Sequence, residues 1–198
     1  MADFDLVIRN ARIVDGTGTP WYRGDAGVRD GVISAVGTLP PGVLCASEID
    51  AGGEVLAPGF IDMHTHNDFL LLGDGAGVSK LRQGVTTILV GQCGISAAPI
   101  RDERVSLLDA YTGFIRAGVT PEWNWRSFAE YLDVLDGLDL GLNVGTFVGH
   151  GTIRLNVLGF ENRLPSPDEL REMREMARAA LEEGAFGMTS GLIYPPGV

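Results

Sequence analysis

The chain has 198 residues, of which 45% are hydrophobic and 28 are glycine, a composition typical of a globular α/β protein with many tight turns. Its net charge is −11 and Lys80 is its only lysine, so the sequence predicts no nucleic-acid surface. No apolar run approaches the length of a membrane span, and the first residues lack the pattern of a signal peptide. In such a chain Cys45 and Cys93 are expected to be reduced thiols, and we expect a cytoplasmic protein that binds no membrane.

Residues 1–57 predict short strands joined by turns. Asn10 is expected to end the first strand, and Asp30-Gly31 lies between two apolar runs, which is a strong hairpin signal. Gly52-Gly53 marks a further turn, and no helical period occurs in this part of the sequence. The pattern predicts that residues 1–57 are the N-terminal part of a small β-sandwich domain without catalytic residues.

From residue 58 onward the pattern changes to strands that alternate with helices, which predicts βα units and a parallel sheet. The run at 85–90 is β-branched and uninterrupted, as in a strand buried on both faces. Strands are also expected at residues 60–63, where the strand should be buried, and at 142–148 and 185–190. Ser166, Pro167 and Glu169 form a capping box before a helix that Gly184 ends.

Four βα strands correspond to the first half of a (β/α)8 TIM barrel, so residues 58–198 are predicted to be this half. Such a barrel needs about 250 residues. We therefore expect the chain to be an N-terminal piece of a longer protein.

Histidine and cysteine occur at three of the four predicted strand ends, where parallel barrels place their functional groups. His64 and His66 follow the first strand and alternate with Thr65, so both imidazoles should share one face. Cys93 follows the second strand. Imidazole and thiolate are common zinc ligands, and the sequence predicts a metal site at His64, His66 and Cys93. Solvated strand-end histidines and a small buried cysteine are the alternatives.

Three further residues near strand ends are candidates for substrate binding. His150, the remaining histidine, could contact substrate or make a structural hydrogen bond. Arg154 could bind a carboxylate in a bidentate manner or form a surface ion pair. Tyr194 could line the pocket or be an ordinary turn aromatic.

The segment Pro58-Gly59-Phe60-Ile61-Asp62-Met63-His64-Thr65-His66 resembles the first barrel strand of the amidohydrolase superfamily. With Asn67-Asp68 and Gly91-Gln92-Cys93-Gly94, the sequence is similar to the N-acyl-D-amino-acid deacylases, or D-aminoacylases. This resemblance implies a barrel beside a sandwich that strands from the far C-terminus complete. It also implies zinc-dependent hydrolysis of the amide bond of a small N-acyl-D-amino acid, giving a carboxylate and a D-amino acid.

The resemblance further implies how the site residues are used. Cys93 would bind a tight zinc with two later histidines, and His64 and His66 would share a weaker metal position with a later aspartate. The general base would be an aspartate beyond residue 198. We therefore expect no catalytic residue within residues 1–198 and no turnover from them alone.

Two other functions are compatible with the sequence. A cyclic-amide hydrolase, similar to dihydroorotase or hydantoinase, commonly has a carbamylated lysine at a strand end. Lys80 lies in a predicted helix instead, whereas Cys93 lies at a strand end, which favours the deacylase. The other possibility is an inactive metal-binding fragment. The substrate's side chain and acyl group, the number of metals and the oligomeric state are left open.

Overall fold

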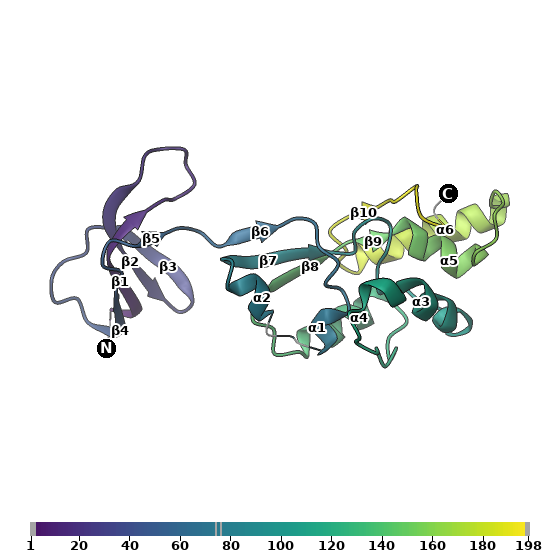
Figure 1. Cartoon of the computed structure of the whole chain (residues 1–198), viewed down its shortest axis with the longest axis horizontal. Helices are drawn as coiled ribbons and strands as arrows, with labels where there is room; N and C mark the ends of the chain where they lie inside the picture. The colour runs from purple at the N-terminus through teal and green to yellow at the C-terminus, as the bar shows by residue number, and fades with distance from the viewer. Residues whose placement is uncertain (1–2, 74, 76, 197–198) are drawn as a thin grey trace. The chain divides into compact units, whose positions relative to one another are not determined.

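The computed structural model of the protein describes residues 3–73, 75 and 77–196. The chain divides into two compact units, one ending at Pro58 and one beginning at Gly59 (Figure 1). Within the described ranges, no helix combines the length and the apolar character needed to cross a membrane. The domains predicted at 1–57 and 58–198 also include residues 1, 2, 74, 76, 197 and 198, which lie outside the described residues.

The N-terminal unit is a single five-stranded sheet with the order β3-β2-β1-β4, in which β5 also pairs with β1. Strand β1 pairs antiparallel with β2 and parallel with β4 and β5. The strands are β1 Phe4–Ile13, β2 Tyr22–Arg29, β3 Val32–Gly37, β4 Cys45–Asp50 and β5 Val55–Leu56.

Two turn predictions in this unit have different outcomes. The Asp30-Gly31 hairpin between β2 and β3 is confirmed, with φ angles of 52° and 74° that suit a type I′ turn. The prediction that Asn10 ends a strand is wrong, because β1 continues through it. Asn10 has a φ of 58° and lies where the register shifts between Ile8 and Ala11. Asparagine tolerates this left-handed conformation, so a bulge forms without ending the strand.

The second unit contains parallel strands in the order β6-β7-β8, together with the parallel pair β9-β10. Only Phe147 separates β8 from β9, so the strand predicted at 142–148 is split in two. The first part, β8, pairs with β7, and the second part, β9, pairs with β10. The pairing partner therefore changes at Phe147. The strands are β6 Phe60–Asp62, β7 Val85–Val90, β8 Asn143–Thr146, β9 Val148–Gly149 and β10 Met188–Thr189.

The core of this unit lies where β7 and β9 pack against helices α3 to α6. Its largest fully buried side chains include Trp125, Phe128 and Tyr131, and α1, α2 and α4 lie along one side of the β6–β8 sheet in Figure 1. The helices are α1 Leu70–Gly73, α2 Val78–Leu81, α3 Val105–Thr112, α4 Phe128–Asp136, α5 His150–Leu158 and α6 Pro167–Glu182, with 3₁₀ turns η1 Asp102–Arg104 and η2 Gly113–Ile115.

The helix predicted after Ser166 is confirmed as α6, and Ser166 and Glu169 form both hydrogen bonds of the capping box. Helix α5 was not predicted. It begins at His150, directly after β9, and residues 151–156 are all buried. A helix buried on every side has no amphipathic period, so the sequence pattern does not reveal it.

The prediction that the strand at residues 60–63 is buried is wrong. Phe60 is 63% exposed and Ile61 60% exposed, whereas Ile88 on the neighbouring β7 is fully buried. Strand β6 pairs only with β7 among the described residues, so it is an edge strand. The described part of the chain leaves most of the surface of these apolar side chains uncovered.

Candidate metal centre

His64 and His66 lie in the segment that follows β6 rather than on the strand itself, because β6 ends at Asp62. The backbone N–H of His64 donates to Asp62 Oδ1 at 3.2 Å. Thr65, between the two histidines, is buried, and its hydroxyl donates to Asn67 Oδ1 at 2.8 Å. The two imidazole rings meet edge to face with centroids 5.7 Å apart. The alternation expected of a strand thus persists beyond its end.

The side chains of Gln92, two residues after β7, and of Lys80, on α2, anchor this histidine segment. Gln92 Nε2 donates to the carbonyl oxygens of Met63 at 2.8 Å and Leu89 at 3.3 Å. Lys80 Nζ lies 2.6 Å from Asp62 Oδ2, and this hydrogen-bonded ion pair lowers the pKa of Asp62. Lys80 therefore lies on a helix, and its ammonium group is paired with Asp62.

Cys93 lies in a tight turn after β7. The N–H of Ile95 donates to the carbonyl of Gln92 at 2.9 Å, and both central residues, Cys93 and Gly94, have positive φ angles of 56° and 77°. For cysteine this left-handed conformation costs about 1–2 kcal/mol, so contacts outside the turn must hold it. One of them is the N–H of Gly91, which donates to Asp68 Oδ1 at 2.7 Å.

Glycines allow three strand ends to pack backbone to backbone around this turn. A Cβ on Gly191 would lie 2.1 Å from the carbonyl oxygen of Cys93, and a Cβ on Gly149 would lie 2.4 Å from that of Gly94. Any larger residue would clash with backbone at either position. The ends of β7, β9 and β10 therefore meet at Cys93.

The ligand atoms of His64, His66 and Cys93 all lie within 4.8 Å of one another. His64 Nε2 is 3.3 Å from Cys93 Sγ, close to the roughly 3.6 Å that tetrahedral zinc bonds to nitrogen and sulfur impose. His66 Nδ1 is buried without a hydrogen-bond partner in the described chain. Burial and the neighbouring His64 lower the pKa of His66, which favours the neutral imidazole that binds metals. This donor set fits a zinc ion.

Two of the three substrate-binding candidates lie near the cysteine turn. His150 is the first residue of α5, and a Cβ on its neighbour Gly151 would be 2.8 Å from Gly94 O. Burial, and then Arg154, lower the pKa of His150, and its Nδ1 has no partner among the described residues. Tyr194 is exposed, and its ring approaches Gly191, which packs on Cys93.

Arg154 has a different environment from the one expected. It is only 7% exposed, and its Nη2 donates to the carbonyl oxygens of Glu161 at 3.0 Å and Arg163 at 2.7 Å. It is not the surface ion pair considered as its alternative. Its guanidinium holds the loop that follows α5.

Sequence reasoning missed Tyr111, on α3. Its hydroxyl oxygen would be 3.0 Å from a Cβ on Gly151, which places it beside the N-terminus of α5. Burial, together with Cys93 and Tyr194, raises the pKa of Tyr111 to about 12, so the hydroxyl keeps its proton at neutral pH. No motif marks this tyrosine, because it lies 18 residues beyond Cys93 in sequence and only the fold brings it to the strand ends.

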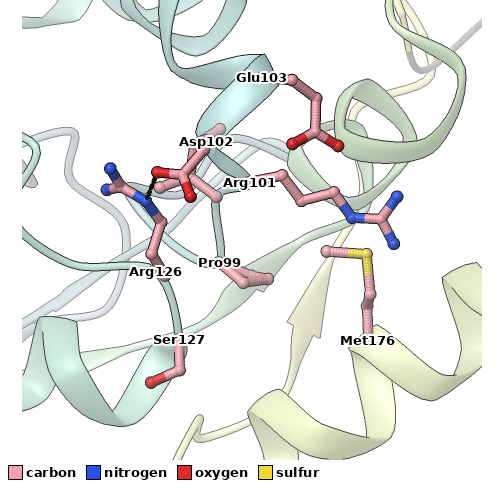
Figure 2. Close-up of a pocket in the computed structure, with 8 residues that line it drawn as sticks. Pro99, Arg101, Asp102, Glu103, Arg126, Ser127 and Met176 are labelled. Carbon is pink, nitrogen blue, oxygen red and sulfur yellow. Dashed lines mark hydrogen bonds and ion pairs between the residues drawn. The ribbon is translucent and has the colours of Figure 1, made fainter.

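A surface hollow of about 420 Å³ lies elsewhere in this unit (Figure 2). None of the six candidate residues lines it. Arg126 Nε is 2.5 Å from Asp102 Oδ1, and Arg101 pairs with Glu172, so the charges of the two arginines at the hollow are largely neutralised. We place the chemistry at the strand ends and not here. The hollow is lined by Pro99, Ile100, Arg101, Asp102, Glu103, Arg126, Ser127 and Met176.

Comparison with known proteins identifies the family. Residues 47–194, most of the chain, match the amidohydrolase family. The chain belongs to this family. It is 37% identical to D-aminoacylase from Alcaligenes xylosoxydans xylosoxydans over 98% of its own length, but spans only 39% of that relative. An amidohydrolase α/β fold is thereby established for the chain.

Solved structures of amidohydrolases agree with this assignment. N-acyl-D-glutamate deacylase from Bordetella bronchiseptica, solved with zinc and a phosphonate inhibitor that mimics the tetrahedral intermediate, matches with a TM-score of 0.85 and 38% identity. A D-aminoacylase with a binuclear metal centre matches with a TM-score of 0.86 and 36% identity. Each match covers 98% of this chain and 40% of the solved chain.

Proposed function

We propose that the chain is part of a zinc-dependent N-acyl-D-amino-acid deacylase. The reaction is hydrolysis of the amide bond of a small N-acyl-D-amino acid to a carboxylate and a D-amino acid. The observation that carries the proposal is the convergence of His64, His66 and Cys93, whose ligand atoms lie within 4.8 Å of one another. The similarity to D-aminoacylase and to the zinc-bound N-acyl-D-glutamate deacylase supports it.

We also propose that residues 58–198 form the first half of a (β/α)8 barrel. The parallel order of β6, β7 and β8, and the separate parallel pair of β9 and β10, support this arrangement. The exposed apolar side chains on the edge strand β6, among them Phe60 and Ile61, are a surface that further strands would cover.

Residues 1–57 are proposed to be the N-terminal part of a β-sandwich. Their single sheet carries an apolar hollow of about 190 Å³ whose lining includes Ile13, Val28 and Ile33. Sheets bury such faces against a second layer, which supports a sandwich.

In this proposal His64, His66 and Cys93 hold zinc, which when bound polarises the amide carbonyl and lowers the pKa of a water molecule. Tyr111 keeps its proton and donates a hydrogen bond to a substrate oxygen. His150, at the start of α5, and Tyr194, in the segment after β10, contact the substrate. We assign Arg154 to support of its loop, because carbonyl oxygens already engage its guanidinium. The general base is expected outside residues 1–198, so no proton transfer is assigned to this chain.

The cyclic-amide hydrolase is the weaker alternative. That enzyme would need a lysine at a strand end. Lys80 instead lies on α2 and forms an ion pair with Asp62. An inactive metal-binding fragment shares the metal site but not the turnover. Cytoplasmic location stays a prediction.

The test compares zinc content and turnover in the protein that carries this chain, using N-acetyl-D-methionine and a hydantoin as substrates. We expect bound zinc, measured by plasma emission spectrometry, and hydrolysis of the linear amide alone. Cys93→Ala should lose the zinc, whereas Cys45→Ala, in the N-terminal sheet, should keep it. Equal zinc in Cys93→Ala and wild type, or hydrolysis of the hydantoin alone, would contradict the proposal. Residues 1–198 alone should show no turnover.

A further inference from the structure

Thr189, on β10, bonds to both sides of the turn that carries Cys93. Its hydroxyl accepts a hydrogen bond from the N–H of Gly94 at 3.1 Å and donates one to the carbonyl oxygen of Gly91 at 2.5 Å. A hydroxyl can donate and accept at once, so this one side chain bridges the two ends of the turn. The bonds reach across 95 and 98 residues of sequence.

The turn needs such an external restraint. Gly91 and Gly94 lie on either side of Cys93 and have φ angles of 78° and 77°. Glycine adopts positive and negative φ angles about equally readily, so these residues do not hold their own conformation. Cys93 itself has a left-handed φ of 56°, which its own side chain does not favour. The direction of the Cys93 thiol therefore depends on what fixes the two glycines.

The end of β10 is well placed to fix them. Thr189 pairs with Gly149 in the β9–β10 ladder, so the position of its backbone is set by the sheet. Two residues later, Gly191 packs directly against the carbonyl of Cys93. Thr152, on α5, adds a bond from its N–H to the carbonyl of Gly94 at 3.2 Å, but contacts only one end of the turn.

We propose that Thr189 is a positioning residue that holds Cys93 Sγ toward His64 and His66. This inference rests on the proposed function, because it takes Cys93 to be a metal ligand. Thr189 also begins the segment that leads to Tyr194. One hydroxyl thus fixes the thiolate and the start of the segment that carries a substrate-binding candidate.

Three variants separate positioning from a general structural role. Thr189→Val keeps the shape of the side chain but removes both hydrogen bonds, and Thr189→Ser keeps the hydroxyl. Thr86→Val is the matched control. It makes the same exchange on β7, where Thr86 is exposed and its hydroxyl forms no hydrogen bond within the described residues.

The first measurement is a titration with Co²⁺ alone, following the thiolate-to-cobalt absorption band, with Cys93→Ala as the blank. We expect the affinity of Thr189→Val to fall about tenfold, the lower end of what residues that orient metal ligands usually contribute. Thr189→Ser should restore it to within about twofold, and Thr86→Val should leave it unchanged. The second measurement, amide hydrogen exchange of the metal-free protein, should show faster exchange at Gly94 in Thr189→Val alone.

Each outcome is decisive. Wild-type cobalt affinity and wild-type exchange at Gly94 in a folded Thr189→Val would overturn the role of Thr189 and leave the metal site intact. A wild-type protein without Cys93-dependent absorption would overturn the metal site itself. If Thr189→Val does not fold, Thr189→Ala is compared with Thr189→Ser, and the same tenfold difference in cobalt affinity is expected.

Discussion

The two neighbouring strands that lead to the candidate metal ligands differ sharply. Strand β6 has three residues, and both Phe60 and Ile61 are mostly exposed. Strand β7 has six residues and runs into the core, where Ile88 and Val90 are fully buried. The strands pair in parallel, so each delivers its following segment to the same edge of the sheet.

The segments after these strands differ in the same way. In the histidine segment the side chain of His64 is exposed to solvent. The hydrogen bonds that hold this segment are made mainly by its backbone groups, the N–H of His64 and the carbonyl of Met63. The cysteine turn is tied to Asp68 on one side and to Thr189 on the other. In the proposed metal site, Cys93 would therefore be the more rigidly held ligand, and the imidazoles of His64 and His66 the more adjustable ones.

The largest expected effect is on stability and compares a substitution on β7 with one on β6. Ile88→Ala should lower the free energy of unfolding by about 2–5 kcal/mol, because it removes a fully buried side chain and leaves a cavity. Ile61→Ala, on the exposed β6, should cost less than about 1 kcal/mol. Urea unfolding followed by circular dichroism measures both. Equal costs would mean that β6 is covered in solution.

A second, smaller effect concerns Asp68, which joins the two regions. It is 0% exposed, and burial raises its pKa from 3.8 to about 7. The unfolded carboxyl loses its proton near pH 4, whereas the folded one keeps it until about pH 7. Unfolding therefore releases a proton in this window, and the stability that this group provides below pH 4 is lost as the pH rises to 7.

Asp68→Asn should remove this loss, which we expect to be about 2 kcal/mol between pH 5 and pH 7. The asparagine keeps an oxygen for the N–H of Gly91. The measurement is the free energy of unfolding at several pH values with a chelator present, and only the difference in slope between variant and wild type is used. Parallel pH profiles would show that Asp68 is ionised in the folded chain.

Much of the local structure could be predicted from sequence, because the signals are local. The Asp30-Gly31 hairpin and the capping box at Ser166 depend on residues within one turn of each other. The alternation of His64 and His66 likewise points to a shared face. Each of these needs only backbone preferences and side-chain reach.

The remaining features depend on contacts between distant residues. Burial of β6 was predicted from its apolar residues, but burial requires a covering layer that the described chain does not place there. Helix α5 is hidden because it is buried on all sides, and Tyr111 and Thr189 reach the site only through the fold. Arg154 was given a possible substrate role because arginine binds carboxylates. Its actual partners are backbone carbonyls of a loop, and no sequence signal marks them.

The smallest expected effect on stability comes from a substitution in the histidine segment. His64→Ala should change the free energy of unfolding by less than about 0.5 kcal/mol, because the side chain is exposed and lies beyond the end of β6. Zinc affinity, measured by competition with a chromophoric chelator, should nevertheless fall at least tenfold, because a ligand is lost and residues that only orient ligands already contribute about tenfold. A large drop in melting temperature with unchanged zinc affinity would assign His64 a structural role instead.

The long reach of the Thr189 bonds has a consequence for how the protein folds. Contacts between residues 91–94 and residue 189 close a loop of almost 100 residues, and such closure is entropically slow compared with turn and helix formation. On a ribosome, Cys93 emerges long before Thr189 is synthesised. The nascent chain therefore carries Cys93 without the restraint of Thr189 until β10 docks, so the turn reaches its final orientation only after residue 189 has been synthesised.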